Sequence, residues 1–401
     1  MSRKSYSIAV VGAGAVGLSA ALAFARDGFE TVLIGRLDTR RDGRTVALLN
    51  GSIRFLEALG VWPSLIPEAA PLQTMRIVDD TGSLFRPPPV SFSAREIDLD
   101  AFGWNIENAT LVEELAESAR AYENLTILTE QATDFRAEAD RAVIVLADGS
   151  EVEVNLVVAA DGRNSRLRQI AGIETQTWSY PQTALAVLLA HDREHRETST
   201  EFHTRNGPFT LVPLPGKRSS LVWVTSQKRA EQLSKLDDQA LALAVERQAQ
   251  SHLGAMRVDG PRGLVPMSGL SVNRYGAPRL ALVGEAAHVF PPIGAQGLNL
   301  GFRDVASLRD AVVDALDNGR EPGSSETLRQ YQLSRDLDVR LRTAAIDGLN
   351  RTLLTGLLPA DLARGAGLLA LSRIGFLRRA VMREGVLPHM GAPRLMQDAS
   401  A

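Results

Sequence analysis

Three glycines near the start of the chain are spaced for phosphate binding. The segment Gly12-Ala-Gly-Ala-Val-Gly17 follows the apolar, β-branched run Tyr6–Val11 and precedes the Ala-rich stretch Leu18–Arg26. In a strand–turn–helix unit such glycines allow a tight turn, a close approach of backbone to pyrophosphate, and close helix packing. The phosphates then lie at the positive end of the helix. The segment predicts a dinucleotide site, although the pattern alone does not separate FAD from NAD. The candidate contacts are Gly12, Gly14, Ala15, Val16 and Gly17.

The second strand of this unit departs from the usual dinucleotide pattern. Thr31–Ile34 is followed by Gly35-Arg36, where an acidic residue ordinarily binds the ribose hydroxyls. We therefore expect either that another group, with Arg36 as a candidate, makes this contact or that the nucleotide is held less tightly.

Two later segments carry further candidate contacts, each after a short apolar strand. Asp161-Gly follows Leu156–Val158, a dipeptide that by itself is usually only a turn. Gly284-Glu285 follows Leu280–Val283 and leads through a Gly- and Pro-rich loop into a helix over Leu298–Leu316. Glycines at this spacing let backbone lie against a flat or charged ligand, and a helix N-terminus stabilises negative charge. The candidates here are Asp161, Gly284, Glu285, Pro292, Gly294, Gln296, Gly297, Leu298 and Asn299.

In this order and separation, the three segments resemble the FAD-binding set of the class A aromatic-ring monooxygenases, the group that contains para-hydroxybenzoate hydroxylase. Arg44–Ser52, Glu201–Pro208 and Met382–Gly385 resemble the ubiquinone-biosynthesis hydroxylase (UbiH-type) branch, so that the resemblance spans nearly the whole chain. It adds Arg44 to the FAD-site candidates. Glu285 departs from the family's usual Gly-Asp, and its carboxylate is one methylene farther from the backbone.

The resemblance implies an activity. It predicts an FAD-dependent monooxygenase that uses NAD(P)H and O2 to hydroxylate an aromatic ring through a flavin C4a-hydroperoxide. A polyprenylated phenol or quinone precursor is one substrate class it suggests. Two alternatives stay open: an FAD-dependent reductase of the geranylgeranyl-reductase type, and a non-catalytic flavin- or quinone-binding subunit of a biosynthetic complex.

No catalytic base and no metal ligand is assigned from the sequence. His203, Tyr180, His191 and Arg205 lie in or near the expected substrate sheet, and each is interpreted as an ordinary strand or surface residue. We call the Gly- and Pro-rich loop before the helix over Leu298–Leu316 the flavin loop. For His288, beside this loop, we expect a structural hydrogen bond rather than proton transfer.

The elements that must position these residues form an α/β (overall α+β) fold. A Rossmann-like FAD-binding domain of the glutathione-reductase type is expected over residues 1–75, 102–175 and 276–330. A mainly antiparallel substrate domain is expected over 76–101 and 176–275, because successive strand patterns replace the βαβ pattern there. Residues 331–401 are expected to form a C-terminal helical region.

Composition limits the remaining function classes. The 401 residues carry a net charge of −3, which offers no basic footprint for nucleic acid. There is no cysteine, which excludes disulfides, thiolate metal sites and disulfide-type flavin reductases. With no long apolar run, we expect a cytoplasmic protein. The Leu- and Arg-rich region Arg340–Arg383 leaves a peripheral membrane or complex contact open as a minor alternative to packing on the FAD domain.

Overall fold

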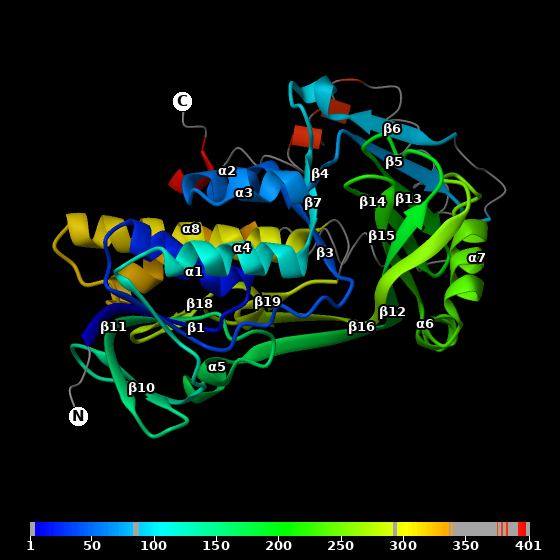
Figure 1. The fold of residues 1–401 in the computed structure, drawn as a ribbon. Helices are drawn as coiled ribbons and strands as arrows, with labels where there is room; N and C mark the ends of the chain where they lie inside the picture. Colours follow the sequence, from blue (N-terminus) through cyan, green and yellow to red (C-terminus); the bar gives the residue numbers. More distant parts are fainter. Residues whose placement is uncertain are drawn as a thin grey trace.

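The molecule is built around two eight-stranded sheets joined by two long strands, with a three-stranded sheet beside them (Figure 1). The structure, a computed structural model, describes residues 5–82, 88–291, 295–336, 338–339 and 392–397, together with residues 375, 378, 379, 382 and 383. Most of the predicted C-terminal helical region, including most of Arg340–Arg383, lies outside the described residues.

The strands are β1 Ser5–Val11, β2 Thr31–Ile34, β3 Thr45–Leu49, β4 Ala70–Pro71, β5 Thr74–Asp79, β6 Val90–Ser93, β7 Gly103–Glu107, β8 Leu125–Leu128, β9 Ala132–Ala137, β10 Ala142–Leu146, β11 Glu151–Ala159, β12 Thr175–His191, β13 Thr198–Thr204, β14 Gly207–Leu214, β15 Arg218–Ser226, β16 Met256–Val272, β17 Gly276–Ala277, β18 Leu280–Leu282 and β19 His288–Val289. The helices are α1 Ala15–Arg26, α2 Asn50–Ala58, α3 Trp62–Leu65, α4 Asn108–Arg120, α5 Arg166–Ile170, α6 Gln227–Ser234, α7 Asp238–Gln248 and α8 Gln296–Asp317, with short 3₁₀ turns η1 Ile66–Glu68, η2 Ala94–Ile97, η3 Gly284–Ala286 and η4 Arg394–Met396. Residues 325–336 are also helical.

The first sheet has the strand order β17-β18-β11-β1-β2-β8, with β9 and β10 added beside β11. The pairs β18–β11, β11–β1, β1–β2 and β2–β8 are parallel, as predicted for the βαβ start of the chain. Helices α1, α4 and α8 cover one face of this sheet (Figure 1). Crossover helices bury parallel strands, and all four residues of β2 are buried, Thr31 included.

The second sheet has the order β19-β16-β12-β15-β14-β13-β5-β6 and is antiparallel except for the β13–β5 pair. Strands β12 and β16 contain 17 residues each and pair with one another along most of their length. Together they run from beside the first sheet into the second (Figure 1). The sequence patterns indicated an antiparallel sheet over 176–275 but not two strands of this length. Three glycines, two prolines and three charged residues interrupt the apolar alternation of β16, so that periodicity alone could not reveal this strand.

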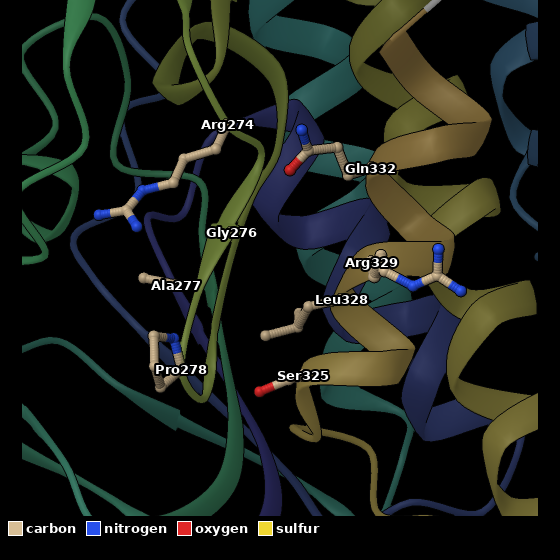
Figure 2. Close-up of a pocket in the computed structure, with 8 residues that line it drawn as sticks. All are labelled: Arg274, Gly276, Ala277, Pro278, Ser325, Leu328, Arg329 and Gln332. Carbon is tan, nitrogen blue, oxygen red and sulfur yellow. The ribbon is translucent and has the colours of Figure 1, made fainter.

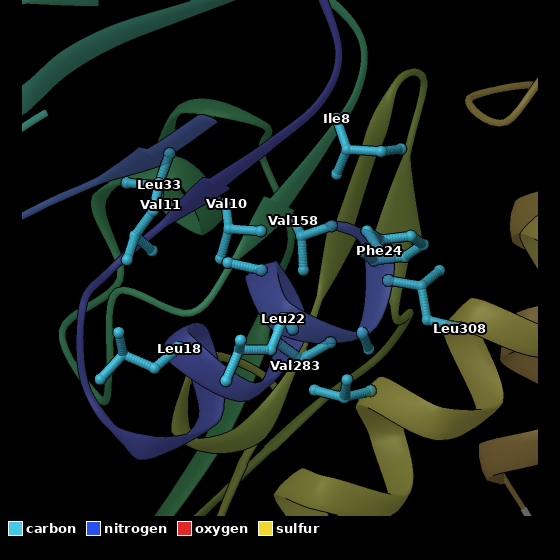
Figure 3. Close-up of a cluster of buried hydrophobic side chains, with 14 of the residues drawn as sticks. Ile8, Val10, Val11, Leu18, Leu22, Phe24, Leu33, Val158, Val283 and Leu308 are labelled. Atoms are coloured by element: carbon cyan, nitrogen blue, oxygen red, sulfur yellow. The ribbon is translucent and has the colours of Figure 1, made fainter. Parts of the chain in front are cut away.

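Helix α1 is the centre of the main apolar core (Figure 3). Leu18, Leu22 and Phe24 of this helix lie in one buried cluster with Val10 and Val158 of the sheet, and all five side chains are fully buried. Full burial of a side chain of this size contributes about 1.5–3 kcal/mol. The core therefore fixes the helix whose N-terminus follows the glycine turn.

None of the helices in the described part of the chain is long and apolar enough to cross a lipid bilayer.

We predict that Leu22→Ala lowers the free energy of unfolding by about 2–5 kcal/mol, because it leaves a cavity at a fully buried position. Leu243→Ala is the matched control, since Leu243 is also helical but 46% exposed, and should change stability by less than about 1 kcal/mol. Urea unfolding followed by circular dichroism measures both. Equal losses for the two variants would contradict the assignment of the core.

Candidate FAD site

The three predicted segments meet at the carboxyl ends of neighbouring parallel strands. Gly12 follows β1, Asp161 lies two residues after β11, and Gly284 lies two residues after β18. Backbone bonds hold the strand ends together: Gly12 N–H donates to Ile34 O (2.8 Å), and Ala160 N–H donates to Val11 O (2.8 Å). Ligands of open α/β sheets bind at such an edge, outside the carboxyl ends of the strands.

The glycines of the first segment divide into two kinds. A Cβ at Gly12 would lie 2.2 Å from Ala160 O, and a Cβ at Gly17 would lie 1.8 Å from Gly12 O, so the fold itself excludes side chains there. A Cβ at Gly14, in contrast, would meet nothing within 4 Å, and the same holds for Gly297 in the first turn of α8. The chain does not need glycine at these two positions. They leave open space at the starts of two helices.

Both helix starts have unused capacity to bind an anion. Helices α1 and α8 begin without a side-chain cap and without an acidic residue in their first turns. Their first amide groups and the positive ends of their dipoles can therefore accept negative charge. A pyrophosphate would fit against the open Gly14, and an electron-rich ring system would fit against the open Gly297. FAD contains both groups.

Asp161 supplies a further free acceptor at this edge. Its Oδ2 accepts hydrogen bonds from the N–H groups of Arg166 (2.8 Å) and Leu167 (3.2 Å), at the start of α5. Its Oδ1 is buried and has no hydrogen-bond partner. A buried, unpaired carboxylate oxygen is costly, so a donor from a bound molecule would be favourable here.

Side-chain contacts clamp the third segment to the other two. The Val16 side chain lies against Gly284 and Gly301, where an added Cβ would come within 3.1 and 2.7 Å of it. The buried Arg168 donates to Ala286 O (2.8 Å) and to Arg163 O (2.8 Å), which joins the Asp-Gly segment to η3. Burial lowers the pKa of Arg168, but its two carbonyl partners satisfy the guanidinium.

Asn299 joins the start of α8 to β3 and α2. Its side-chain oxygen accepts from Leu49 N–H (2.9 Å) and Ser52 Oγ (2.6 Å), and its amide donates to Ala47 O (2.8 Å) and Ala295 O (2.5 Å). These bonds use the full capacity of the amide group. The Asn299 side chain therefore positions the loop rather than offering a contact to a ligand.

A buried carboxylate, Asp304, holds the loop from behind. Its Oδ2 accepts from Gly284 N–H (2.9 Å) and lies 2.6 Å from His288 Nε2, while its Oδ1 accepts from Arg335 Nε (2.7 Å). The carboxylate is fully buried, and the side chains of His288 and Arg335 are only 1% exposed. Burial alone would raise the pKa of Asp304, but the charges of His288 and Arg335 and these hydrogen bonds lower it. The structural hydrogen bond predicted for His288 is confirmed, whereas the role of Asp304 was not predicted.

The remaining predicted residues differ in their surroundings. Arg36 and Glu285 are exposed, and neither side chain bonds another of the described residues, so both are free to meet a ligand. Arg44 pairs with Asp42 (2.6 Å). A Cβ added at Gly35 would lie 3.1 Å from Ala13 N. The structure also describes Ala15 and Gln296 as the first residues of α1 and α8, with Leu298 half-buried in α8. Pro292 and Gly294 lie outside the described residues.

The residues considered as possible bases have separate partners. His191 bonds Arg193 O (2.7 Å) and Ser219 Oγ (3.0 Å), and burial lowers its pKa. The Tyr180 hydroxyl accepts from Trp178 Nε1 (2.8 Å), and Arg205 Nε donates to Thr81 O (2.5 Å). His203 is buried beside Glu201. These contacts explain the first three as structural residues.

A separate hollow of about 210 Å³ lies at the edge strand β17 and the helix over residues 325–336 (Figure 2). Arg274 on its rim donates to the carbonyls of Ala171 and Gly172, and Arg329 is paired with Glu326. None of the predicted site residues lines it. We therefore place the functional site at the strand ends and not in this hollow.

Comparisons with known proteins show the family and the fold. Residues 5–341 match the family described as FAD binding domain. The chain is 35% identical to ubiquinone hydroxylase UbiL of Rhodospirillum rubrum over 96% of this chain and 90% of that protein. It is 30% identical to 3-demethoxyubiquinol 3-hydroxylase of Escherichia coli over 96% of this chain and 99% of that protein. The fold resembles p-nitrophenol 4-monooxygenase PnpA of Pseudomonas putida, with a TM-score of 0.79, 17% identity, and coverage of 96% and 98% of the two chains.

We predict that Asp304→Asn destabilises the protein by about 3–5 kcal/mol, because it leaves Arg335 buried beside a neutral group. Asp314→Asn is the control on the same helix: its side chain is 51% exposed, and its ion pair with Arg394 should contribute at most about 1 kcal/mol. Urea unfolding compares the two. Similar small losses would show that the buried cluster is not a structural centre.

The lowered pKa of Asp304 also predicts a pH effect. The folded state holds this carboxyl deprotonated more strongly than the unfolded state, so its contribution to stability is present above the ordinary pKa of Asp and is lost as the pH falls through the folded-state value. The free energy of unfolding measured between about pH 5 and 3 should therefore fall less steeply in Asp304→Asn than in the wild type. Parallel slopes would contradict this assignment.

Proposed function

This chain belongs to the FAD binding domain family and is an FAD-dependent aromatic monooxygenase, and on that premise we propose that it hydroxylates the ring of a polyprenylated phenol or quinone precursor in ubiquinone biosynthesis. The names of the two relatives, a ubiquinone hydroxylase and a demethoxyubiquinol hydroxylase, support this substrate class. The comparisons support neither the reductase nor the non-catalytic alternative, because the relatives are named hydroxylases and monooxygenases.

The observation that carries the cofactor site is the pair of open glycines at two uncapped helix starts. We assign the pyrophosphate to the amides that follow Gly14, and the flavin to the start of α8 at Gly297. Asp161 Oδ1 would accept a hydrogen bond from the bound molecule, and Glu285 and Arg36 are free to reach its hydroxyl and phosphate groups. Bound FAD, reduced by NAD(P)H, supplies the chemistry that activates O2.

The chain's own residues then place the substrate and exclude water. We propose that residues 1–75, 102–175 and 276–330 form the FAD-binding domain and that 76–101 and 176–275 present the substrate. Phe290, next to the flavin loop, packs against Ala184, Val224 and Met267 of the second sheet. This contact supports a substrate position between the flavin loop and the second sheet. The proposal also locates the enzyme in the cytoplasm, with a peripheral membrane contact that gives access to a prenylated substrate.

The primary test is chromophore identification followed by an oxygenation assay. We expect the purified protein to release FAD on heating, and we expect a 2-prenylated phenol to stimulate NAD(P)H oxidation with one hydroxylated product per O2 consumed. Stimulated oxidation without any hydroxylated product would overturn the proposed reaction.

A glycine variant tests the cofactor site itself. Gly14→Ala adds a methyl group into open space, so it should change unfolding of the apoprotein by no more than about 1 kcal/mol. It should nevertheless weaken FAD binding about tenfold or more, because the methyl group takes the pyrophosphate's place. Gly263→Ala is the control, since its Cβ would have only one neighbour, Asp42 O, at 3.7 Å. Fluorescence titration with FAD that gives equal affinities for both variants would place the pyrophosphate elsewhere.

A further inference from the structure

Helices α6 and α7 cover one face of the second sheet, and the other face is partly open. Residues that pair across neighbouring strands share a face of the sheet. Leu185, Phe209 and Trp223 point to the face that α6 and α7 cover, and they are buried in a common apolar cluster with these helices. Glu201 and His203 point to the opposite face, one residue out of phase with Phe202 of that cluster.

The strand register places Glu201 and His203 in line with the residues that contact the flavin loop. One row across the sheet reads Glu201, Thr210, Val222 and Ala186. In the neighbouring row His203 lies opposite Pro208, and the same register leads to Val224 and Ala184. Val224 and Ala184 pack with Phe290 of the segment that enters the flavin loop. His203 and the flavin-loop contacts therefore stand on the same face, two strands apart, or roughly 10 Å.

The row of side chains beside them is accessible, whereas the row of His203, Pro208, Val224 and Ala184 is buried. Glu201, Thr210 and Val222 are each only half-buried, although they belong to strands with a partner on both sides. Their neighbours on the opposite face, Phe202, Phe209 and Trp223, are buried. Partial exposure confined to one face of inner strands marks an opening above that face. From Glu201 to Val222 it spans two strand spacings, or roughly 10 Å, which suits one substituted aromatic ring.

A paired carboxylate and imidazole stand at the far side of this opening. His203 Nε2 lies 2.7 Å from Glu201 Oε1, and the Thr210 hydroxyl donates to Glu201 Oε2 (3.2 Å). His203 is 6% exposed, and its Nδ1 is buried without a hydrogen-bond partner. Burial alone would raise the pKa of Glu201, but the hydrogen bond and charge of His203 lower it. An ionised Glu201 favours the tautomer with the proton on Nε2, which leaves a lone pair on Nδ1.

We propose that the Glu201–His203 pair binds the hydroxyl group of the substrate ring and accepts its proton. The O–H bond breaks, its electron pair stays on the ring oxygen, and the proton bonds to Nδ1 of His203. The resulting imidazolium is stabilised by the Glu201 carboxylate, and the ring becomes a better nucleophile. This inference rests on the proposed ring hydroxylation. Among the described residues, the other titratable group on this face beside His203 is Asp79, across from it on β5, whose carboxylate accepts from Thr81.

The direct test is the ionisation of a bound chromogenic phenol. We expect 4-nitrophenol bound to the FAD-loaded wild type to show the phenolate absorption band at a pH at least about one unit below that of the free compound, a tenfold stronger acidity. His203→Gln and Glu201→Gln should remove this shift, and His252→Gln, at a histidine on the helix-covered side, should retain it. Unaltered FAD content and melting temperature establish that the variants fold. A shift that persists in His203→Gln, or its absence from the wild type, overturns the proposal.

Turnover gives a second, independent measurement. With a 2-prenylated phenol, His203→Gln should still oxidise NAD(P)H but release most of the oxygen as hydrogen peroxide, so that hydroxylated product per O2 falls about tenfold or more. Equal coupling in His203→Gln and wild type would overturn the role of the pair. A wild type that hydroxylates no phenol would refute the proposed function instead, and the nitrophenol titration would still report on the pair by itself. Thr210→Val, which removes only the bond to Glu201 Oε2, should give a smaller loss of coupling.

Discussion

The arrangement of the site depends on one buried carboxylate. Asp304 has no contact with water, and a charge in that position would be strongly destabilising without partners. Its three partners are the backbone of Gly284 and the ring of His288, which lie in one segment, and the guanidinium of Arg335 from a later one. The same interaction that neutralises Asp304 therefore fixes η3, β19 and the helix over residues 325–336 relative to α8. Arg168 extends this constraint to the Asp-Gly segment through Ala286 O.

Local sequence patterns predicted the parts of the structure that depend on short-range physics. The βαβ start, the antiparallel character of the second sheet and the long helix after the flavin loop were correct because strand and helix periods are visible over a few residues. The assignment to FAD-binding monooxygenases was also confirmed, since three spaced segments carry it. The contacts of the individual cofactor residues stay predictions.

The buried polar contacts could not be predicted in the same way. Asp304 pairs with residues 16 and 31 positions away, and Glu201 meets Thr210 only through the pairing of β13 with β14. Gly35 was interpreted as a missing acidic residue, but its φ of +150° and its close approach to Ala13 give a steric reason for glycine. A single sequence shows residue types. The roles of these residues depend on which groups the fold brings to within about 3 Å of them.

The two 17-residue strands have a consequence for how the molecule comes apart. Over roughly 55 Å each, β12 and β16 contribute ladder hydrogen bonds to the far sheet while their inner ends adjoin the first. Neither sheet can lose its order without exposing the shared ribbon, so the two halves should melt in one cooperative transition despite their different architectures. The register shifts of the ribbon near Ser179 and Val187 are then its natural flexion points, where the halves can tilt without separating.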